Sequence, residues 1–208
     1  MKRRYIGKSV ERFRDPYFVT GRGKFVSDFY LPRMLHAAIL RSPYAYARIN
    51  KIDTKKASKH PGVVAVLTGT DAAKLSKPIP FMYSPTGFGS KTADVYALAI
   101  DCARYVGEPV AVVVAENKHA AHEALQLVEV DYTPLTPVVD AEKALEPNSP
   151  LVYEPWGDNL LLKTRFTGGD VDRAFKDADY VIKDTLKSHR YTGAPIEPRA
   201  YVADYDHQ

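Results

Sequence analysis

The sequence predicts a fold of the α+β class, and three consecutive features carry this prediction. Residues 109–115 (PVAVVVA) are apolar throughout and of strand length, which is typical of a strand covered on both faces. Asn117 then stands at an N-cap position, ahead of apolar residues at the spacing of one helical face. Over residues 128–132 apolar and acidic residues alternate, which indicates a strand with one packed face. Together they predict a β-α-β unit, with a right-handed crossover if its strands are parallel.

The preceding residues are expected to cover this unit with further strands and short helices. Apolar runs bounded by turn-forming residues predict strands at residues 35–40, 47–52 and 63–67. Capping residues predict one short helix after Asp53 and another starting near Thr70. Residues 76–89 contain three prolines and two glycines, so they predict a long irregular loop, and loops of that length are often functional or face a partner.

A series of prolines after Tyr132 marks the expected domain boundary. It contains one predicted helical turn, at residues 140–145. Further strands are predicted at residues 160–167, 180–187 and 200–205, with a helix capped by Asp170 among them. This second part is too short to bury a core by itself, and its strand edges need partners. We therefore expect the chain to be a fragment or one piece of a split protein.

The composition excludes several classes of protein. The chain has 208 residues, of which 45% are hydrophobic, and no run of apolar residues reaches the length of a membrane span or a signal peptide. A cytoplasmic location without membrane contact is the expectation. Cys102 is the single cysteine, which rules out an internal disulfide and a cysteine-ligated iron–sulfur cluster held by this chain alone. The net charge of +4 is dispersed and no nucleic-acid-binding motif accompanies it, so no nucleic-acid partner is expected.

Local catalytic and metal-binding motifs are absent from the sequence. There is no phosphate-binding loop, no nucleophile elbow and no paired-cysteine zinc spacing. His119, His122 and Glu123 could bring two imidazoles together on the central helix, although a solvated polar face explains them equally. Residues 168–170 (GGD) precede a helix N-terminus, where an anion could bind or Asp170 could act as a plain N-cap. We predict no catalytic, cofactor-binding or metal-binding residue from these patterns.

Three further positions are candidates. Cys102 and His36 each stand in a predicted strand, and we interpret them as structural residues rather than as a nucleophile and a metal ligand. Residues 197–199 (EPR) follow a stretch rich in polar residues, glycine and proline between two predicted strands. This stretch predicts a site-lining loop; the alternative is a salt-bridged connection between strands.

Several short stretches form a recognisable series along the chain. They are residues 20–23 (TGRG) with Asp28, 35–43 (LHAAILRSP), 61–68 (PGVVAVLT) with Asp71, 106–115 (VGEPVAVVVA), 128–132 (VEVDY), and 197–200 (EPRA) with Val202 and Ala203. In this order they resemble the molybdenum-cofactor-binding large subunit of the xanthine dehydrogenase, aldehyde oxidase and aerobic carbon monoxide dehydrogenase family. The resemblance extends over nearly the whole chain.

The resemblance implies a domain organisation. It comprises an N-terminal arm (residues 1–14), an α/β hammerhead domain (15–135), a proline-rich linker (136–156) and the start of the first molybdopterin-binding domain (157–208). It also implies that Glu197 and Arg199 belong to a segment near the molybdenum site, without acting as catalysts. The glycine-rich stretch of that site and the late glutamate that serves as general base in the family are expected in sequence beyond Gln208.

The resemblance further implies cofactors and partners. The complete enzyme would hold a molybdopterin-type molybdenum cofactor and oxidise a small-molecule substrate such as an aldehyde, a heterocycle or carbon monoxide. Electrons would leave through iron–sulfur clusters and FAD in partner domains or subunits. We expect the chain to be the N-terminal portion or a split subunit of such an enzyme, inactive alone and completed by the remainder of the large subunit. The alternative is a non-catalytic interaction module that reuses the hammerhead fold.

Overall fold

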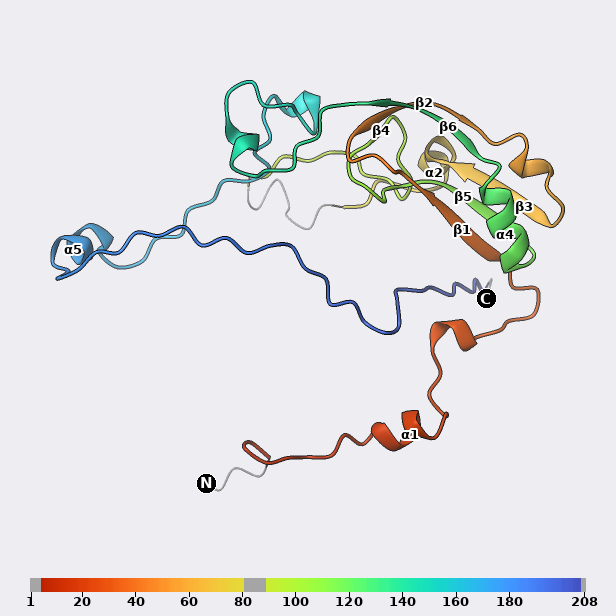
Figure 1. The fold of residues 1–208 in the computed structure, drawn as a ribbon, viewed down its shortest axis with the longest axis horizontal. Helices are drawn as coiled ribbons and strands as arrows, with labels where there is room; N and C mark the ends of the chain where they lie inside the picture. The colour runs from red at the N-terminus through yellow and green to blue at the C-terminus, as the bar shows by residue number, and fades with distance from the viewer. Residues whose placement is uncertain (1–4, 81–88, 207–208) are drawn as a thin grey trace. The chain divides into compact units, whose positions relative to one another are not determined.

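The computed structural model describes residues 5–80 and 89–206, which divide into two compact units. One unit comprises residues 33–177, and the other combines the residues up to 32 with those from 178 onward. All strands of the described chain belong to the first unit (Figure 1). The two units are therefore different in kind: one is built on β-sheets, and the other has only short helices.

The first sheet of the 33–177 unit has the valine-rich run as its central strand. In this antiparallel sheet β5 (Pro109–Ala115) lies between β1 (His36–Arg41) and β3 (Val63–Thr68). Alternate β5 side chains are fully buried on the face that α4 covers, whereas Val112 and Val114 on the other face are half-buried. The central position of this strand is confirmed, but only one of its faces is fully covered.

Helix α4 (Lys118–Leu125) packs on this sheet and begins where its cap predicts. The side-chain oxygen of Asn117 accepts a hydrogen bond from the backbone N–H of Ala120 at 2.9 Å, which satisfies one of the free donors of the first turn. The buried helix residues are all alanines. Their small side chains let the helix approach the sheet closely, and with Ala57, Ala111, Val113 and Val128 they form the core.

The second sheet shows that the predicted β-α-β unit is wrong in its pairing. Here β2 (Ala47–Asp53) lies between β4 (Cys102–Ala103) and β6 (Glu129–Pro134), and again both pairings are antiparallel. The strands that flank α4 therefore belong to different sheets, and no parallel crossover joins them. Alternating residues define the two faces of a strand, but they do not specify its partner; β6 instead pairs with β2, from Asp53 opposite Glu129 onward.

Two further short helices lie between strands in the described part of the first unit, η2 (Ala57–Lys59) and α2 (Gly69–Leu75). Three more follow the last strand of the described chain: η3 (Lys143–Leu145), η4 (Glu154–Trp156) and α5 (Val171–Lys176). A capping box opens α2, in which Asp71 accepts hydrogen bonds from the backbone and hydroxyl of Thr68. Asp170 caps α5 by accepting from the backbone of Arg173 at 3.0 Å. None of the helices among the described residues has the length and apolar composition that a membrane-crossing helix requires.

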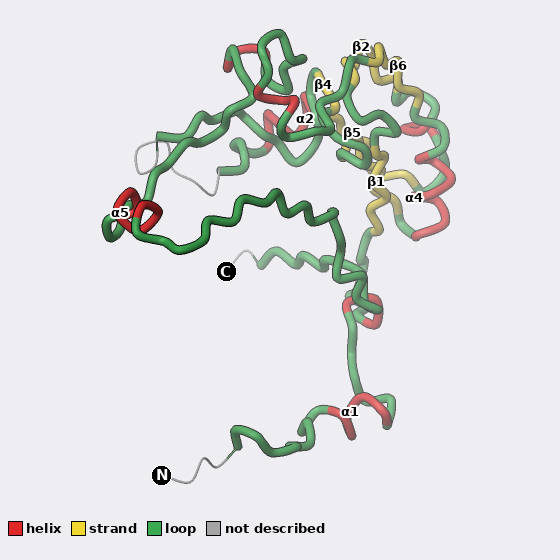
Figure 2. Tube along the Cα trace, turned by 60° about the vertical axis from the view of Figure 1, so that its left-hand side comes forward, coloured by secondary structure: helices red, strands yellow, loops and turns green. Residues whose placement is uncertain are grey.

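The second unit contains α1 (Asp15–Val19), η1 (Val26–Asp28) and a long irregular segment. Residues 178–206 are exposed and have neither helix nor strand, so the tube in Figure 2 is drawn there as loop. The strands predicted at residues 180–187 and 200–205, and at 160–167 in the first unit, are wrong for this structure. These segments have strand-like sequences, but among the described residues none forms a ladder of backbone hydrogen bonds with a neighbouring strand, and a strand exists only with such a ladder.

The long loop predicted at residues 76–89 is only partly described. Residues 77–80 have no helix or strand, as expected, and residues 81–88 lie outside the described residues.

Candidate functional site

The 33–177 unit contains an open cavity of about 740 Å³ between the second sheet and the proline-rich segment. Its walls come from β2 and β4, from the chain that leads into β4, and from residues 152–156. Among the residues that line it, several have chemically active or aromatic side chains, including Tyr46, Cys102, Arg104, Glu108, Tyr153 and Trp156. It is therefore the candidate site of this unit for a binding or catalytic function.

Arg104 connects the two walls of the cavity. Its Nη1 donates to the carbonyl oxygen of Cys102 at 3.2 Å, and its Nε donates to the carbonyl oxygen of Val152 at 3.3 Å. The guanidinium also lies 4.6 Å from the centroid of the Tyr153 ring, a cation–π distance. The guanidinium thus contacts both walls, the strand at Cys102 and the proline-rich segment at Val152 and Tyr153. Arg104 therefore attaches this segment to the sheet.

Glu108 lies at the turn that precedes β5. Its Oε2 accepts a hydrogen bond from the backbone N–H of Arg104. Burial raises the pKa of the Glu108 carboxyl above its ordinary value, and this hydrogen bond and the charge of Arg104 offset the rise only in part. Such a carboxyl could serve as a proton donor or acceptor, but here its contacts hold the turn.

Further hydrogen bonds attach the proline-rich segment. The Tyr46 hydroxyl donates to the Leu151 carbonyl oxygen at 3.0 Å, and the Trp156 indole N–H donates to the Thr92 carbonyl oxygen at 2.9 Å. Lys91 Nζ donates to the carbonyl oxygen of Trp156 at 3.1 Å and pairs with the carboxylate of Asp158. We interpret the cavity lining as a structural attachment. Sequence reasoning missed it because its residues are far apart in the chain; the aromatic residues within a proline-rich stretch were the available signal.

The other candidates from the sequence lie in structural surroundings. Cys102 is buried in β4, with 7% of its surface exposed, and burial raises the pKa of its thiol, which suppresses the reactive thiolate. His36 is half-buried in β1. His119 and His122 are exposed on α4, and the described residues contain no group of three or more His, Cys, Asp or Glu placed to hold a metal ion.

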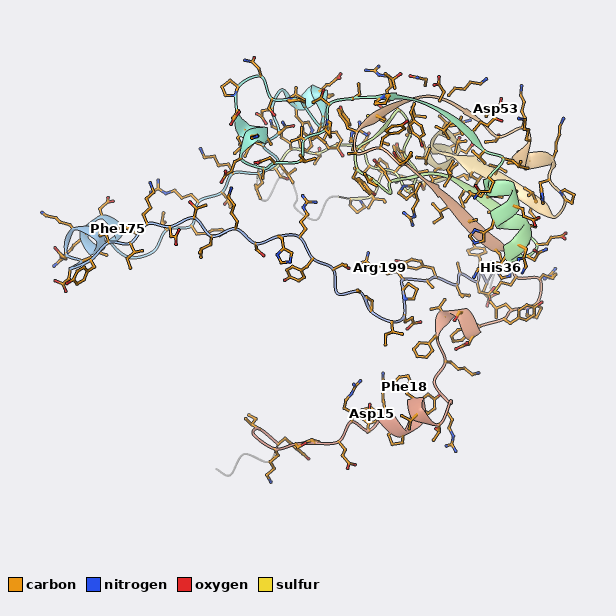
Figure 3. All side chains as sticks on the ribbon, viewed as in Figure 1. Asp15, Phe18, His36, Asp53, Phe175 and Arg199 are labelled. Carbon is orange, nitrogen blue, oxygen red and sulfur yellow. The ribbon has the colours of Figure 1, made fainter. Side chains whose placement is uncertain are left out.

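The segment expected near a molybdenum site lies in the other unit. Glu197 Oε1 accepts a hydrogen bond from the backbone N–H of Val26 at 3.2 Å. Arg199 is exposed on the irregular segment (Figure 3). Since every residue from 178 to 206 is exposed, this stretch by itself forms no enclosed cradle for a large cofactor, and we derive no chemical step through one.

Protein-family models match two consecutive parts of the chain. Residues 20–136 match the α/β hammerhead domain of aldehyde oxidase and xanthine dehydrogenase. The chain belongs to the aldehyde oxidase and xanthine dehydrogenase family. Residues 152–208 match the molybdopterin cofactor-binding domain. The family assignment and the α+β fold with a hammerhead domain are thereby confirmed.

Individual relatives agree with this assignment. The chain is 39% identical to the nicotine 6-hydroxylase large subunit of Paenarthrobacter nicotinovorans and 38% identical to the carbon monoxide dehydrogenase large chain of Afipia carboxidovorans, over 98% and 97% of its length. It spans only about a quarter of these relatives, 25% and 26% of their lengths. Among solved structures, quinoline 2-oxidoreductase from Pseudomonas putida 86 is similar with a TM-score of 0.71 and 38% identity, over 85% of this chain and 22% of that one.

Proposed function

We propose that this chain supplies the hammerhead domain and the first part of the molybdopterin-binding domain to a molybdenum-dependent hydroxylase or dehydrogenase. The observation that carries the proposal is the match of two family models in succession, at residues 20–136 and 152–208. The proposed boundaries are an arm at residues 1–14, the hammerhead domain at 15–135, a linker at 136–156 and the start of the cofactor-binding domain at 157–208.

The stretch would be inactive alone, and the remainder of the large subunit would complete it. Residues 178–206 support this part of the proposal, because they are exposed, contain strand-like sequences and have no strand partner among the described residues. In the complete enzyme we assign the molybdopterin-type molybdenum cofactor to the large subunit and the iron–sulfur clusters and FAD to partner domains or subunits. The family's chemistry, oxidation of a small molecule at the molybdenum centre, is the proposed activity.

We further propose that Glu197 and Arg199 lie close to the cofactor in the complete enzyme. Both residues fall within the match to the molybdopterin cofactor-binding domain. Their exposure here is what a segment that packs on a further domain would show before that domain is added. Neither is assigned a catalytic role.

The test is to produce residues 1–208 alone and together with the rest of the large subunit and its partner subunits. Bound molybdenum is measured by mass spectrometry, and oxidation of an aldehyde, a nitrogen heterocycle and carbon monoxide is followed with an artificial electron acceptor. We expect molybdenum and activity only in the complete assembly. Molybdopterin bound to the lone chain would overturn its proposed inactivity, and a complete assembly that lacks molybdenum would overturn the enzymatic proposal.

A further inference from the structure

The hydrogen bond between Glu197 and Val26 joins two segments that are far apart in the sequence. From it we infer that Glu197 is a positioning residue, which anchors the 197–199 segment to the turn at residues 25–28. This inference rests on the proposed function in one respect: it takes residues 197–199 to lie near the cofactor.

The turn that receives Glu197 has a defined backbone. In η1, Asp28 Oδ2 accepts a hydrogen bond from the N–H of Phe25 at 2.9 Å, and the N–H of Asp28 donates to the carbonyl oxygen of Phe25 at 2.9 Å. These two bonds close the turn and leave the N–H of Val26, at the first helical position, without a partner inside the helix. Glu197 Oε1 accepts from this donor at 3.2 Å. A carboxylate is the preferred acceptor there, because the amide groups of a helix start carry partial positive charge.

Residues 16–23 support the turn from the other side. The Thr20 hydroxyl donates to the carbonyl oxygen of Pro16 at 2.6 Å, closing α1, and Gly21 has a φ of +71°. A Cβ on Gly23 would lie 2.5 Å from the ring of Phe18, so only glycine allows that ring its place. The Phe18 ring in turn stacks on the Phe25 ring, with 5.9 Å between centroids. Gly23 thus leaves room for the Phe18 ring, which packs on Phe25, the residue that begins the turn to which Glu197 binds.

This arrangement explains why two stretches singled out in the sequence occur together. Asp28 closes the turn, Gly23 makes room for the ring that packs on Phe25, and Glu197 binds to the turn. The Glu197 carboxylate is used in a hydrogen bond to the protein's own backbone, so it acts on the reaction indirectly. Its effect comes from the position that it gives to the following residues, Arg199 included.

The test uses the complete enzyme with three single substitutions, Glu197→Ala, Glu197→Gln and Val26→Pro, and the double variant Glu197→Ala/Val26→Pro. Proline fits the first helical position, and Phe25 before it has a β-region backbone (φ −110°, ψ 168°), so Val26→Pro removes the donor without a conflict in the backbone. Asp204→Ala, an exposed carboxylate of the same segment, is the matched control. Amide exchange of residues 27–31 is followed by mass spectrometry, with kcat and KM per bound molybdenum.

We expect Glu197→Ala and Val26→Pro each to speed exchange by roughly fivefold, the effect of losing one hydrogen bond. The double variant should be no faster than either single one, because both remove the same contact. Glu197→Ala and Val26→Pro should also lower kcat, with KM little changed. Glu197→Gln keeps an acceptor, so it should retain most of the protection and a kcat close to that of the wild type. Unchanged exchange in Glu197→Ala, or additive effects in the double variant, would overturn the inference. The exchange measurements need no activity, so they remain decisive even if the assembly lacks molybdenum and the proposed function fails.

Discussion

The guanidinium of Arg104 lies 4.6 Å from the centroid of the Tyr153 ring, and this pair joins β4 to the proline-rich segment. Arg104 directly follows the two-residue strand, and Tyr153 directly precedes η4. Proline-rich stretches are often semi-rigid spacers between domains. Here the stretch instead packs on the sheet of β2, β4 and β6. Residues 152 and 153 are therefore attached to that sheet.

Replacing Arg104 by alanine should loosen this attachment. The variant loses two hydrogen bonds to backbone carbonyls and the cation–π contact, and we expect a loss of about 2 kcal/mol in the free energy of unfolding. Trp156, the single tryptophan, stacks on Tyr153 and reports on this region by its fluorescence during urea unfolding. Arg104→Lys should lower the free energy of unfolding nearly as much, because a lysine ammonium lacks the planar guanidinium that makes both hydrogen bonds while it lies over the Tyr153 ring. The exposed Arg165→Ala is the control; equal midpoints for it and Arg104→Ala would contradict the assignment.

Glu108 should make stability depend on pH. Burial raises the pKa of its carboxyl in the folded state, so the folded protein holds this proton at pH values where the unfolded chain has released it. The folded state then binds more protons, and stability falls as pH rises from the unfolded value through the raised folded value. Glu108→Gln keeps an acceptor for the Arg104 N–H and removes the titration. Relative to wild type, the variant should therefore gain stability as pH rises through that range. Parallel stability curves in urea titrations at each pH would argue against this account.

Local features of the fold were predictable from the sequence because they depend on neighbouring residues. The strand at residues 109–115 and the caps at Asn117 and Asp170 lie where the sequence indicates, and α2 begins at Gly69, one residue before the predicted start, with Thr68 as its N-cap. Pairing between strands was not predictable in this way. The alternation at residues 128–132 marks a strand correctly, but its partner β2 lies far away in the sequence. The sequences at 160–167, 180–187 and 200–205 likewise suit strands, but in the described residues no neighbouring strand pairs with them.

The contacts of the candidate site were harder to predict for the same reason. The sequence singled out Glu197 and, separately, the stretch that ends at Asp28, but nothing local indicated that they meet. Similarly, Arg104 and Tyr153 are 49 positions apart by their numbers, and neither belongs to a motif. Such contacts depend on the tertiary fold, which composition and periodicity do not specify.

Cys102 should be protected from thiol reagents in the folded protein. It is buried in β4, and burial raises the pKa of its thiol, so both access and the thiolate fraction are low. We expect reaction with a disulfide reagent at pH 8 to be at least roughly tenfold slower in buffer than in denaturing urea. As the control, Ser188→Cys in a Cys102→Ser background places a thiol in the exposed segment, where urea should change the rate little. Rapid labelling of Cys102 under native conditions would show that β4 is open.

Gly69 tests the packing at the start of α2. A Cβ at this position would lie 2.1 Å from the carbonyl oxygen of Ala99, a backbone atom that cannot rotate away. Gly69→Ala should therefore destabilise the protein by about 1–3 kcal/mol through overpacking. Helix propensity alone predicts the opposite sign, since alanine is favoured over glycine in a helix by about 1 kcal/mol. Gly168→Ala is the matched control: its Cβ would meet no atom within 4 Å, and we expect a change within about 0.5 kcal/mol. A gain in stability in Gly69→Ala, measured as a higher urea midpoint, would mean that the chain before β4 does not press against α2 as this structure has it.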